Sequence, residues 1–397
     1  MKDRSYKVDQ LEESQTLALT SLARRLKEQG VDVLSLTAGE PDFPTPDHIK
    51  KAAIQAIENN FTRYTANEGI PDLIKAIVKK FKEDNNLHFE PSQIVVSTGA
   101  KHAIYNSLQA LCNPEDEVII PAPYWVSYPE MVKLVDAVPV IVSAAHDAGF
   151  KITAQQLLKA VTSKTKAFIF NSPSNPTGAV YSQKEIEAIA EVVAETGIYV
   201  VSDEIYEKVM YDGATHFSIG SIEKIKDQVI TVNGVSKAYS MTGWRIGYLG
   251  AKKEIAQACA KIQSQVTSNA NSIAQKAAVA ALGNHSVELG VMVEEFHKRR
   301  NFTVEQLKGM KGVTVDYPHG AFLLFPSVEA FLGKKFNGKI MNNDMDICHF
   351  LIEQEHLVLV PGSAFGMNGY VRLSYACSMN ELEEGMKRMK RGLEKLS

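Results

Sequence analysis

The sequence predicts an α/β fold whose large domain has a mainly parallel sheet covered by helices on both faces. Seven short runs rich in β-branched residues lie between about residues 90 and 250, and helical stretches separate them. In chain order, these runs are QIVVST, DEVIIPA, VPVIVSA, KAFIFNS, IYVVSDE, QVITVNG and IGYLGA. Apolar strands separated by helices are typical of a parallel sheet buried on both sides.

The helical pattern supports this fold class and divides the chain. In KEIEAIAEVVAET, residues 184–196, the apolar side chains at 186, 189, 192 and 193 form one stripe of an amphipathic helix. Beyond residue 270 we expect helices over 271–282, 293–310 and 379–396, and strands near 320–327, 357–363 and 371–376. The pattern predicts a large domain over residues 46–289 and a smaller α+β domain formed by residues 1–45 and 290–397.

Composition excludes several functional classes. The 397 residues suit two domains, and 43 Lys and Arg against 46 Asp and Glu give a net charge of −3 without any block of like charge. Nothing in this balance favours nucleic acid or an anionic membrane as partner. The four cysteines form no CxxC pair, and the polar N-terminus lacks the apolar core of a signal peptide. We therefore expect reduced thiols and a cytoplasmic location.

One short stretch places two cations close together. GVSKAYSMTGWRIG, residues 234–247, follows a predicted strand and contains Lys237 and Arg245. Like charges at such spacing are unfavourable unless an anion or separate carboxylates hold them, although a solvated surface would also accept both. In an open α/β sheet, ligands bind beyond the carboxyl ends of the strands. The residues after the other strands therefore help to decide between a ligand site and a solvated surface.

Polar and aromatic residues follow four further strands. Small residues 98–100 open a helix after IVVS, and such a helix start binds anions; Lys101 in this first turn is unfavourable without a nearby anion. The others are Asp203 and Tyr206 after IYVVS, Asn175 in SNPTG, and Trp125 after VIIPAP. Taken singly, these residues also fit an N-cap, a turn and a packed aromatic ring.

One ligand, pyridoxal phosphate, accounts for all these residues. Its aldehyde needs a lysine amine, its phosphate needs an arginine and backbone N–H groups, and its ring nitrogen needs a carboxylate. Its ring oxygen accepts hydrogen bonds from an amide and a phenol, and an aromatic side chain stacks on the ring. Lys237 and Arg245 would then serve opposite ends of one cofactor.

Two nucleotide-binding patterns are not supported. GKKFNGKI, residues 333–340, matches GxxxxGK, but Ile340 occupies the Ser/Thr position and no strand precedes the motif. The dinucleotide pattern GxGxxG is absent from the sequence. No metal ion is expected.

At this point the sequence resembles the class I pyridoxal-phosphate aminotransferases of fold type I. The likeness covers nearly the whole chain and is closest to bacterial aspartate aminotransferases of subgroup Ib, some of which also transaminate prephenate. The motifs that carry it are LTAGEPDF, RYTANEGIPDL, PAPYWVSYPEM, NSPSNPTG, VSDEIYE and SKAYSMTGWRIG. Together they imply a fold type I transferase whose large domain binds the cofactor.

The resemblance implies a role for each matching residue. Lys237 binds the cofactor aldehyde and acts as general base, Asp203 pairs with the ring nitrogen, and Tyr206 belongs with them in the catalytic set. Tyr206 and Asn175 donate to the ring oxygen, and Trp125 stacks on the ring. The phosphate contacts are Arg245, Ser236 and the backbone of Gly99, Ala100 and Lys101.

The resemblance also implies a dimer and a substrate site. Tyr64 matches a tyrosine that reaches the phosphate of the neighbouring subunit, which makes a homodimer the functional unit. Arg372 grips the substrate α-carboxylate beside Gly39, Asn175 and Trp125, while Lys101 and Thr16, with Gln15 nearby, select a second carboxylate. Gly234 departs from the many relatives that have serine there, so we expect one fewer phosphate contact.

These roles predict a ping-pong aminotransferase that moves the amino group of aspartate to 2-oxoglutarate. Prephenate as a further acceptor is left open. Two alternatives are an alanine or aromatic aminotransferase or a C–S lyase on the same frame, and a non-catalytic regulatory protein. No basic DNA-binding module precedes residue 30 and every catalytic position is filled, which argues against the regulatory protein.

Overall fold

A seven-stranded, mainly parallel sheet forms the centre of the computed structural model, which describes residues 4–11, 15–283 and 287–397 but not the side chains of 15–18 and 20. The strand order is β2-β8-β7-β6-β5-β3-β4, and β4, β3, β5, β6 and β7 run parallel, whereas β8 is antiparallel to β7 and β2. The strands are β2 (Ile94–Ser97), β3 (Glu117–Ala122), β4 (Val138–Ser143), β5 (Thr165–Asn171), β6 (Tyr199–Asp203), β7 (Val229–Gly234) and β8 (Gly247–Gly250). All seven predicted runs form strands, so the predicted α/β class is confirmed.

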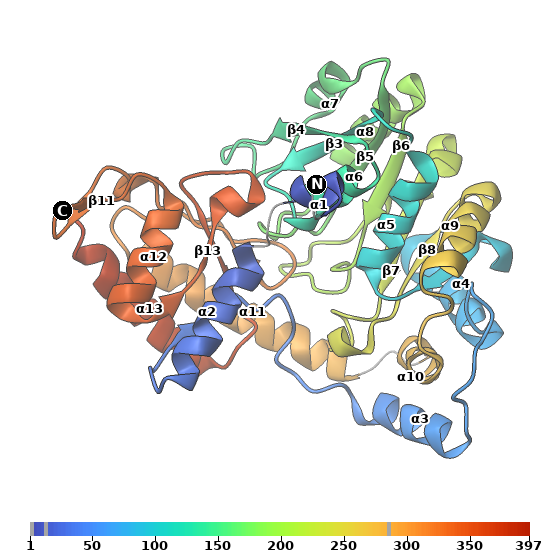
Figure 1. The fold of residues 1–397 in the computed structure, drawn as a ribbon, viewed down its shortest axis with the longest axis horizontal. Coiled ribbons are helices and arrows are strands. Elements are labelled where there is room, and N and C mark those ends of the chain that lie inside the picture. The colour runs from blue at the N-terminus through green and yellow to red at the C-terminus, as the bar shows by residue number, and fades with distance from the viewer. Residues whose placement is uncertain (1–3, 12–14, 284–286) are drawn as a thin grey trace.

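Helices cover both faces of this sheet (Figure 1). One face packs against α5 (Ala100–Leu111), α6 (Ser127–Leu134) and α9 (Lys253–Val266), and the other against α4 (Pro71–Asn85), α7 (Ala154–Ala160), α8 (Gln183–Thr196) and α10 (Ser272–Gly283). Side chains alternate along each strand: Val201 joins the core under α5 and α9, whereas Val200 joins the core under α8. Both faces are therefore apolar, as the continuous β-branched runs predict.

The C-terminal elements form a second body with a small antiparallel sheet. Its strands are β9 (Leu323–Leu324), β13 (Val360–Pro361) and β14 (Val371–Ser374), and its helices are α11 (Val287–Lys308), α12 (Asp344–Glu355) and α13 (Met379–Glu394). Near the N-terminus, α2 (Gln15–Glu28) leads to β1 (Leu34–Ser35), which pairs in parallel with β12 (Leu357–Val358). The predicted domain boundaries stay a prediction, and α11 runs through residue 289 without a break.

One predicted C-terminal strand is shorter than expected, and GKKFNGKI, for which no phosphate loop was expected, forms a hairpin. The strand near 320–327 is only β9, because Ala321 has a left-handed φ of 58° and Pro326 cannot donate to a strand partner. GKKFNGKI forms a hairpin of β10 (Lys335–Phe336) and β11 (Lys339–Ile340), with φ of 47° at Asn337 and 82° at Gly338. Two successive residues with positive φ make the tight turn that Asn-Gly favours, so this motif is no phosphate loop.

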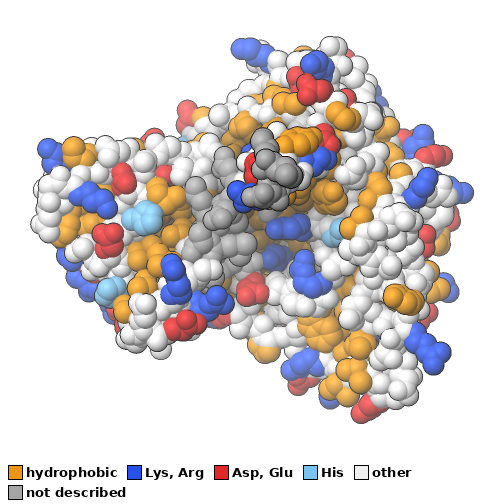
Figure 2. Space-filling model, viewed as in Figure 1, with side chains coloured by type: hydrophobic (Ala, Val, Ile, Leu, Met, Phe, Trp, Pro, Cys, Tyr) orange, Lys and Arg blue, Asp and Glu red, His pale blue; other side chains and the backbone are white. Residues whose placement is uncertain are grey.

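The remaining helices are short or peripheral. They are α1 (Tyr6–Asp9) and α3 (Asp47–Glu58), with short 3₁₀ segments at Pro91–Gln93, Ile219–Ser221, Glu223–Gln228, Thr242–Trp244, Glu329–Phe331 and Gly362–Phe365. Among the described residues, no helix has both the length and the apolar character needed to cross a membrane. Between the sheet and the C-terminal body, Lys and Arg side chains gather in a hollow (Figure 2).

Candidate active site

A cavity of about 380 Å³ lies at the carboxyl ends of the parallel strands and brings together most of the predicted residues. The predicted residues that line it are Gly39, Ala100, Lys101, Trp125, Asn175, Asp203, Tyr206, Ser236, Lys237, Arg245 and Arg372. Most come from the segments that follow β2, β3, β5, β6 and β7, whereas Gly39 follows β1, Arg245 precedes β8 and Arg372 lies on β14 of the C-terminal body. The strand ends therefore converge on one site, as expected for an open α/β sheet.

Lys237 presents a reactive amine to this cavity. Its Nζ donates a hydrogen bond to the carbonyl of Gly39 and lies 5.8 Å from the ring centre of Tyr206. Burial lowers the pKa of Lys237 to about 8, helped by the positive charges of Arg245 and Arg372 and opposed by Glu40 and Asp203. The lowered pKa makes the neutral amine easier to reach than for an ordinary lysine, and the neutral amine is the form that acts as nucleophile or base.

Asp203 is a buried carboxylate at the end of β6. The Tyr128 hydroxyl donates to its Oδ2 at 2.7 Å, and the backbone N–H of Ile205 donates to its Oδ1 at 3.2 Å. Burial raises the pKa of Asp203 to about 6, although these two hydrogen bonds act in the opposite direction. No cation forms an ion pair with Asp203 in the described part of the chain. A buried carboxylate in this state favours a cationic ligand group.

Sequence reasoning missed Tyr128, which is fully enclosed beside Asp203. Burial and the charge of Asp203 raise the pKa of Tyr128, so its hydroxyl keeps its proton and remains a donor. Its ring meets Trp125 edge to face with centres 5.3 Å apart. The i, i+3 spacing to Trp125 was visible in the sequence, but the contact with β6 depends on how α6 packs.

Arg245 and the start of α5 form an anion-binding corner. Gly99 has a φ of 86°, and a Cβ there would lie 2.2 Å from Nη2 of Arg245, so only glycine lets the guanidinium approach this closely. Arg245 has a φ of 57°, and its Nη1 donates to the carbonyl of Thr242 at 3.0 Å. No side chain caps α5. A guanidinium beside an uncapped helix N-terminus is suited to phosphate.

Arg372 is a second cation without a carboxylate. It is 3% exposed, its Nη2 donates to the carbonyl of Thr37 at 2.6 Å, and its buried Nε has no partner. Burial lowers the pKa of Arg372 to about 10, with Tyr206 opposing. Neither Arg372 nor Arg245 makes an ion pair within the residues that the structure describes. Both are placed to receive anionic groups of ligands.

Amide and phenol groups complete the cavity. Asn175 is buried with no partner for its Oδ1, and burial raises the pKa of Tyr206, which keeps its hydroxyl protonated. Asn171, which the sequence reasoning did not single out, donates from Nδ2 to the backbone carbonyl of Asp203 at 2.9 Å and accepts from the N–H of Asn175 at 2.9 Å. It thereby ties the ends of β5 and β6 together.

Of the residues expected to select the substrate or to reach the partner's site, only some can be placed at the cavity. Lys101 lies at the open side of the cavity with its Nζ 4.7 Å from the ring centre of Trp125, and partial burial and Arg245 lower its pKa. The side chains of Thr16 and Gln15 lie outside the described residues. Tyr64 is 91% exposed and does not line this chain's cavity.

Gly234 has a structural reason to lack a side chain. A Cβ there would lie 2.9 Å from the carbonyl oxygen of Ile246, because β7 and β8 approach closely. Serine at this position would require the backbone to shift. The loss of one phosphate contact stays a prediction.

Comparison with known proteins agrees with this geometry. Residues 31–389 match the model of the family described as aminotransferase class I and II, and the chain belongs to that family. A probable aspartate/prephenate aminotransferase of Rickettsia bellii is 47% identical over 390 residues, 98% of each chain. Among solved structures, the aspartate aminotransferase of Rhizobium meliloti has a TM-score of 0.97 at 40% identity, with both chains fully covered.

A further solved structure, the aspartate aminotransferase of Thermus thermophilus with maleate, has a TM-score of 0.93 at 39% identity and covers 99% of this chain and 100% of its own. The family resemblance and the fold expected from the motifs are therefore confirmed.

The anion corner yields a direct prediction. Gly99→Ala should weaken binding of inorganic phosphate at least about tenfold, because the methyl group would displace the guanidinium. Isothermal titration calorimetry on both proteins would measure this change. Gly197→Ala is the control for adding a methyl group at a glycine of positive φ, 73°, where the Cβ position has open space around it. Equal phosphate affinity in the two variants would contradict the assignment.

Proposed function

We propose that the protein is a pyridoxal-phosphate-dependent aminotransferase that moves the amino group of aspartate to 2-oxoglutarate. The observation that carries the proposal is one cavity holding a lysine of lowered pKa, a buried carboxylate and two arginines without carboxylate partners. The naming of relatives over full length as aspartate or aspartate/prephenate aminotransferases supports the substrate. Prephenate, which also carries two carboxylates, is proposed as a further acceptor.

The residues present fit the cofactor. Arg245, Ser236 and the N-terminus of α5 would hold the phosphate, Asp203 would keep a proton on the ring nitrogen, and Lys237 would bind the aldehyde. Asn175 and Tyr206 would donate to the ring oxygen, and Trp125 would stack on the ring. When bound, pyridoxal phosphate supplies an aldehyde that takes up the substrate's amino group and a ring that withdraws electrons from the α-carbon.

The protein's own side chains carry the proton and the orientation. Arg372 would bind the α-carboxylate of the substrate beside Gly39, which fixes the α-carbon relative to Lys237. The Lys237 amine, with its pKa near 8, would remove the α-proton and later deliver a proton to the product. Tyr128 stabilises the ionised form of Asp203 through its hydrogen bond.

The second carboxylate of aspartate needs a further cation. Lys101 is the candidate because its ammonium lies at the open side of the same cavity, on the aromatic face of Trp125. Thr16 is proposed to act beside it. The maleate named with the Thermus thermophilus structure is a dicarboxylate, which supports a site for two carboxylates.

A homodimer in the cytoplasm is the proposed working form. Tyr64 is 91% exposed, and Ile54 and Ile57 on α3 are each 53% exposed, so these apolar side chains are available to a partner. A second copy covering this face would bury them and bring Tyr64 to the neighbouring phosphate. The four cysteines are free thiols, which supports a reducing compartment.

A half-reaction panel tests the proposed function. The protein loaded with pyridoxal phosphate is mixed with one amino donor at a time, and the cofactor's absorbance is followed. Fast conversion by aspartate and glutamate but slow conversion by alanine and phenylalanine is expected, and arogenate tests the prephenate reaction. Rapid conversion by alanine or phenylalanine without aspartate would instead support the other aminotransferase classes. Cleavage of the side chain from the amino acid substrate would support a lyase. Absence of conversion with every donor would support a non-catalytic protein.

Lys101→Ala tests whether Lys101 binds the second carboxylate of the substrate. We expect kcat/KM for aspartate to fall at least about tenfold more than kcat/KM for alanine, because alanine has no second carboxylate for the ammonium to bind. Alanine serves as the internal control for damage to the rest of the cavity. Equal losses for both amino acids would show that Lys101 does not select the side chain.

Tyr128→Phe should shift the pH at which affinity for pyridoxal phosphate falls. Asp203 must be ionised to pair with a protonated ring nitrogen, so cofactor affinity should fall as pH drops through the pKa of this carboxyl group. Because the Tyr128 hydrogen bond lowers the pKa of Asp203, its loss should shift the limb upward by about one pH unit. Fluorescence titration with pyridoxal phosphate from pH 5 to 8 measures this.

Tyr105→Phe is the control for that titration, since among the described residues the Tyr105 hydroxyl bonds only Gln109, on the exposed side of α5. The cofactor phosphate titrates identically in all variants, so only the difference between variants reports Asp203. If Tyr128→Phe left the pH dependence of cofactor affinity unchanged, the proposal that Tyr128 lowers the pKa of Asp203 would be contradicted.

A further inference from the structure

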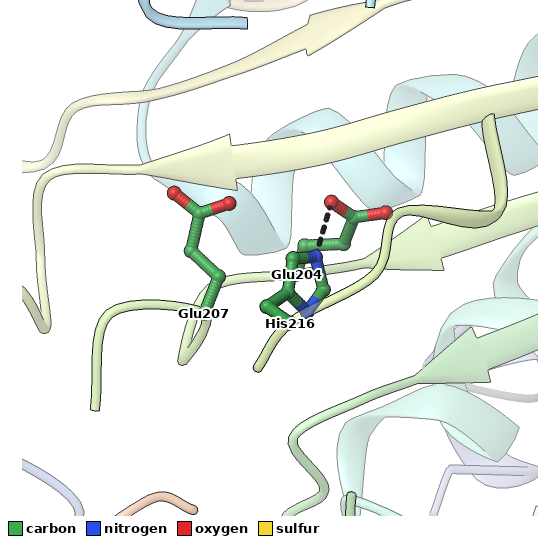
Figure 3. Close-up of side chains that lie close together, drawn as sticks. All are labelled: Glu204, Glu207 and His216. Carbon is green, nitrogen blue, oxygen red and sulfur yellow. Dashed lines mark hydrogen bonds and ion pairs between the residues drawn. The ribbon is translucent and has the colours of Figure 1, made fainter. Parts of the chain in front are cut away.

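A buried group of charged side chains lies on the opposite side of the segment that carries Asp203 and Tyr206. Glu204 and His216 are joined by a hydrogen bond with Glu207 beside them (Figure 3), and one ligand-type atom from each of the three lies within 4.8 Å of the other two. None of the three lines the cavity. Pocket-facing and network-facing residues thus lie next to each other in the chain, Asp203 beside Glu204 and Tyr206 beside Glu207.

Every carboxylate oxygen in this group has a partner. Oε1 of Glu204 accepts from the hydroxyls of Ser202 and Ser218 at 2.9 and 2.7 Å, and its Oε2 accepts from Nε2 of His216 at 2.9 Å. Asn85 bridges the two glutamates by donating from Nδ2 to Glu204 at 3.1 Å and to Glu207 at 2.6 Å. The other oxygen of Glu207 pairs with the ammonium of Lys80.

Lys80 supplies the positive charge from a distant part of the sequence. It lies on α4, is 7% exposed, and also donates to Oδ1 of Asn85 at 2.5 Å. Its ammonium lies 3.9 Å from Asp84, which pairs with Lys208 at 2.8 Å. The carboxylates therefore have a cation from the protein itself, and the group is an internal ion network rather than a vacant metal site.

The electrostatics of the network depend on this cation. Burial alone would raise the pKa of Glu207, but Lys80, His216 and the hydrogen bond from Asn85 lower it overall. Burial would lower the pKa of His216, but Glu204 and Glu207 outweigh burial and raise it. Burial raises the pKa values of Tyr239 and Tyr248, helped by the negative charge of Glu207, so both hydroxyls stay neutral. Without Lys80, the buried carboxylate of Glu207 would lose its ion-pair partner, which is strongly unfavourable.

We propose that Lys80 is a positioning residue for the cavity: by neutralising Glu207, it anchors the segment 203–207 so that Asp203 and Tyr206 face the ligand. The segment is short and tightly bonded, with the N–H of Glu204 donating to Val232 at 2.9 Å and that of Glu207 donating to Glu204 at 3.0 Å. A shift at Glu207 is therefore transmitted to Tyr206 and Asp203. The inference rests on the proposed function, which assigns these two residues to the cofactor.

The test compares Lys80→Met with Lys79→Met in the full-length chain. Lys79 is the adjacent residue on α4, and its side chain is 68% exposed, so its loss controls for removing a lysine from this helix. Hydrogen–deuterium exchange of amides 203–209 is measured without cofactor, and the Kd for pyridoxal phosphate is measured by titration. Amides 167–171 in β5 report whether the sheet itself remains folded.

For Lys80→Met we expect exchange of amides 203–209 to rise at least about tenfold, unchanged protection of β5, and a Kd about tenfold higher. Lys79→Met should match the wild type. Lys80→Met/Glu207→Gln removes both charges, so it should return exchange and Kd to within about threefold of the wild type.

Three outcomes would overturn the proposal. Lys80→Met with a lower melting temperature but wild-type exchange at 203–209 and wild-type Kd would limit Lys80 to a structural role. Loss of protection in β5 to the same extent as at 203–209 would show general unfolding. A double variant as impaired as the single variant would exclude charge neutralisation as the cause. If the wild type bound no pyridoxal phosphate, the proposed function would fail separately, while the exchange result would still decide whether Lys80 anchors the segment.

Discussion

The cost of burying charge without a counter-charge governs this structure. At the carboxyl edge of the sheet, Arg245, Arg372 and Asp203 lie in one cavity without ion-pair partners among the described residues, and burial shifts the pKa values of Asp203, Lys237 and Arg372. Behind the same edge, Glu204 and Glu207 are fully paired by Lys80, His216 and Asn85. The charges without ion-pair partners therefore line the face proposed to bind ligand, and the paired charges lie on the face proposed to support it.

The fold brings these groups together by placing strand ends at one edge. The segments after β2, β3, β5, β6 and β7 reach the cavity, and Arg245, just before β8, meets the start of α5 because β8 pairs with β2 at Gly247 and Ser97. That approach needs glycine twice: a Cβ on Gly99 would strike Arg245, and one on Gly247 would lie 2.1 Å from the backbone nitrogen of Ala100. The C-terminal body then adds Arg372 on β14.

Sequence reasoning reached the parts that depend on local pattern. Strand runs, the helix over 184–196 and the residues after each strand follow from periodicity and turn chemistry, and the motifs supplied the family. It did not reach Tyr128 or Asn171, because their partner Asp203 is distant in the sequence and the contacts arise from packing. Lys80 reads as one of several lysines on an amphipathic helix, and only the structure shows it buried. The hairpin at Asn337-Gly338 has a local signal in the sequence, since Asn-Gly favours a tight turn with two positive φ values.

The most direct measurement is a crystal structure of the protein with pyridoxal phosphate and maleate bound together. The account predicts the phosphate between Arg245 and the start of α5, the ring nitrogen at Asp203, one maleate carboxylate on Arg372 and the other within ion-pair distance of Lys101. A phosphate bound elsewhere, or maleate held without Arg372, would contradict the claim that these unpaired charges define the ligand site.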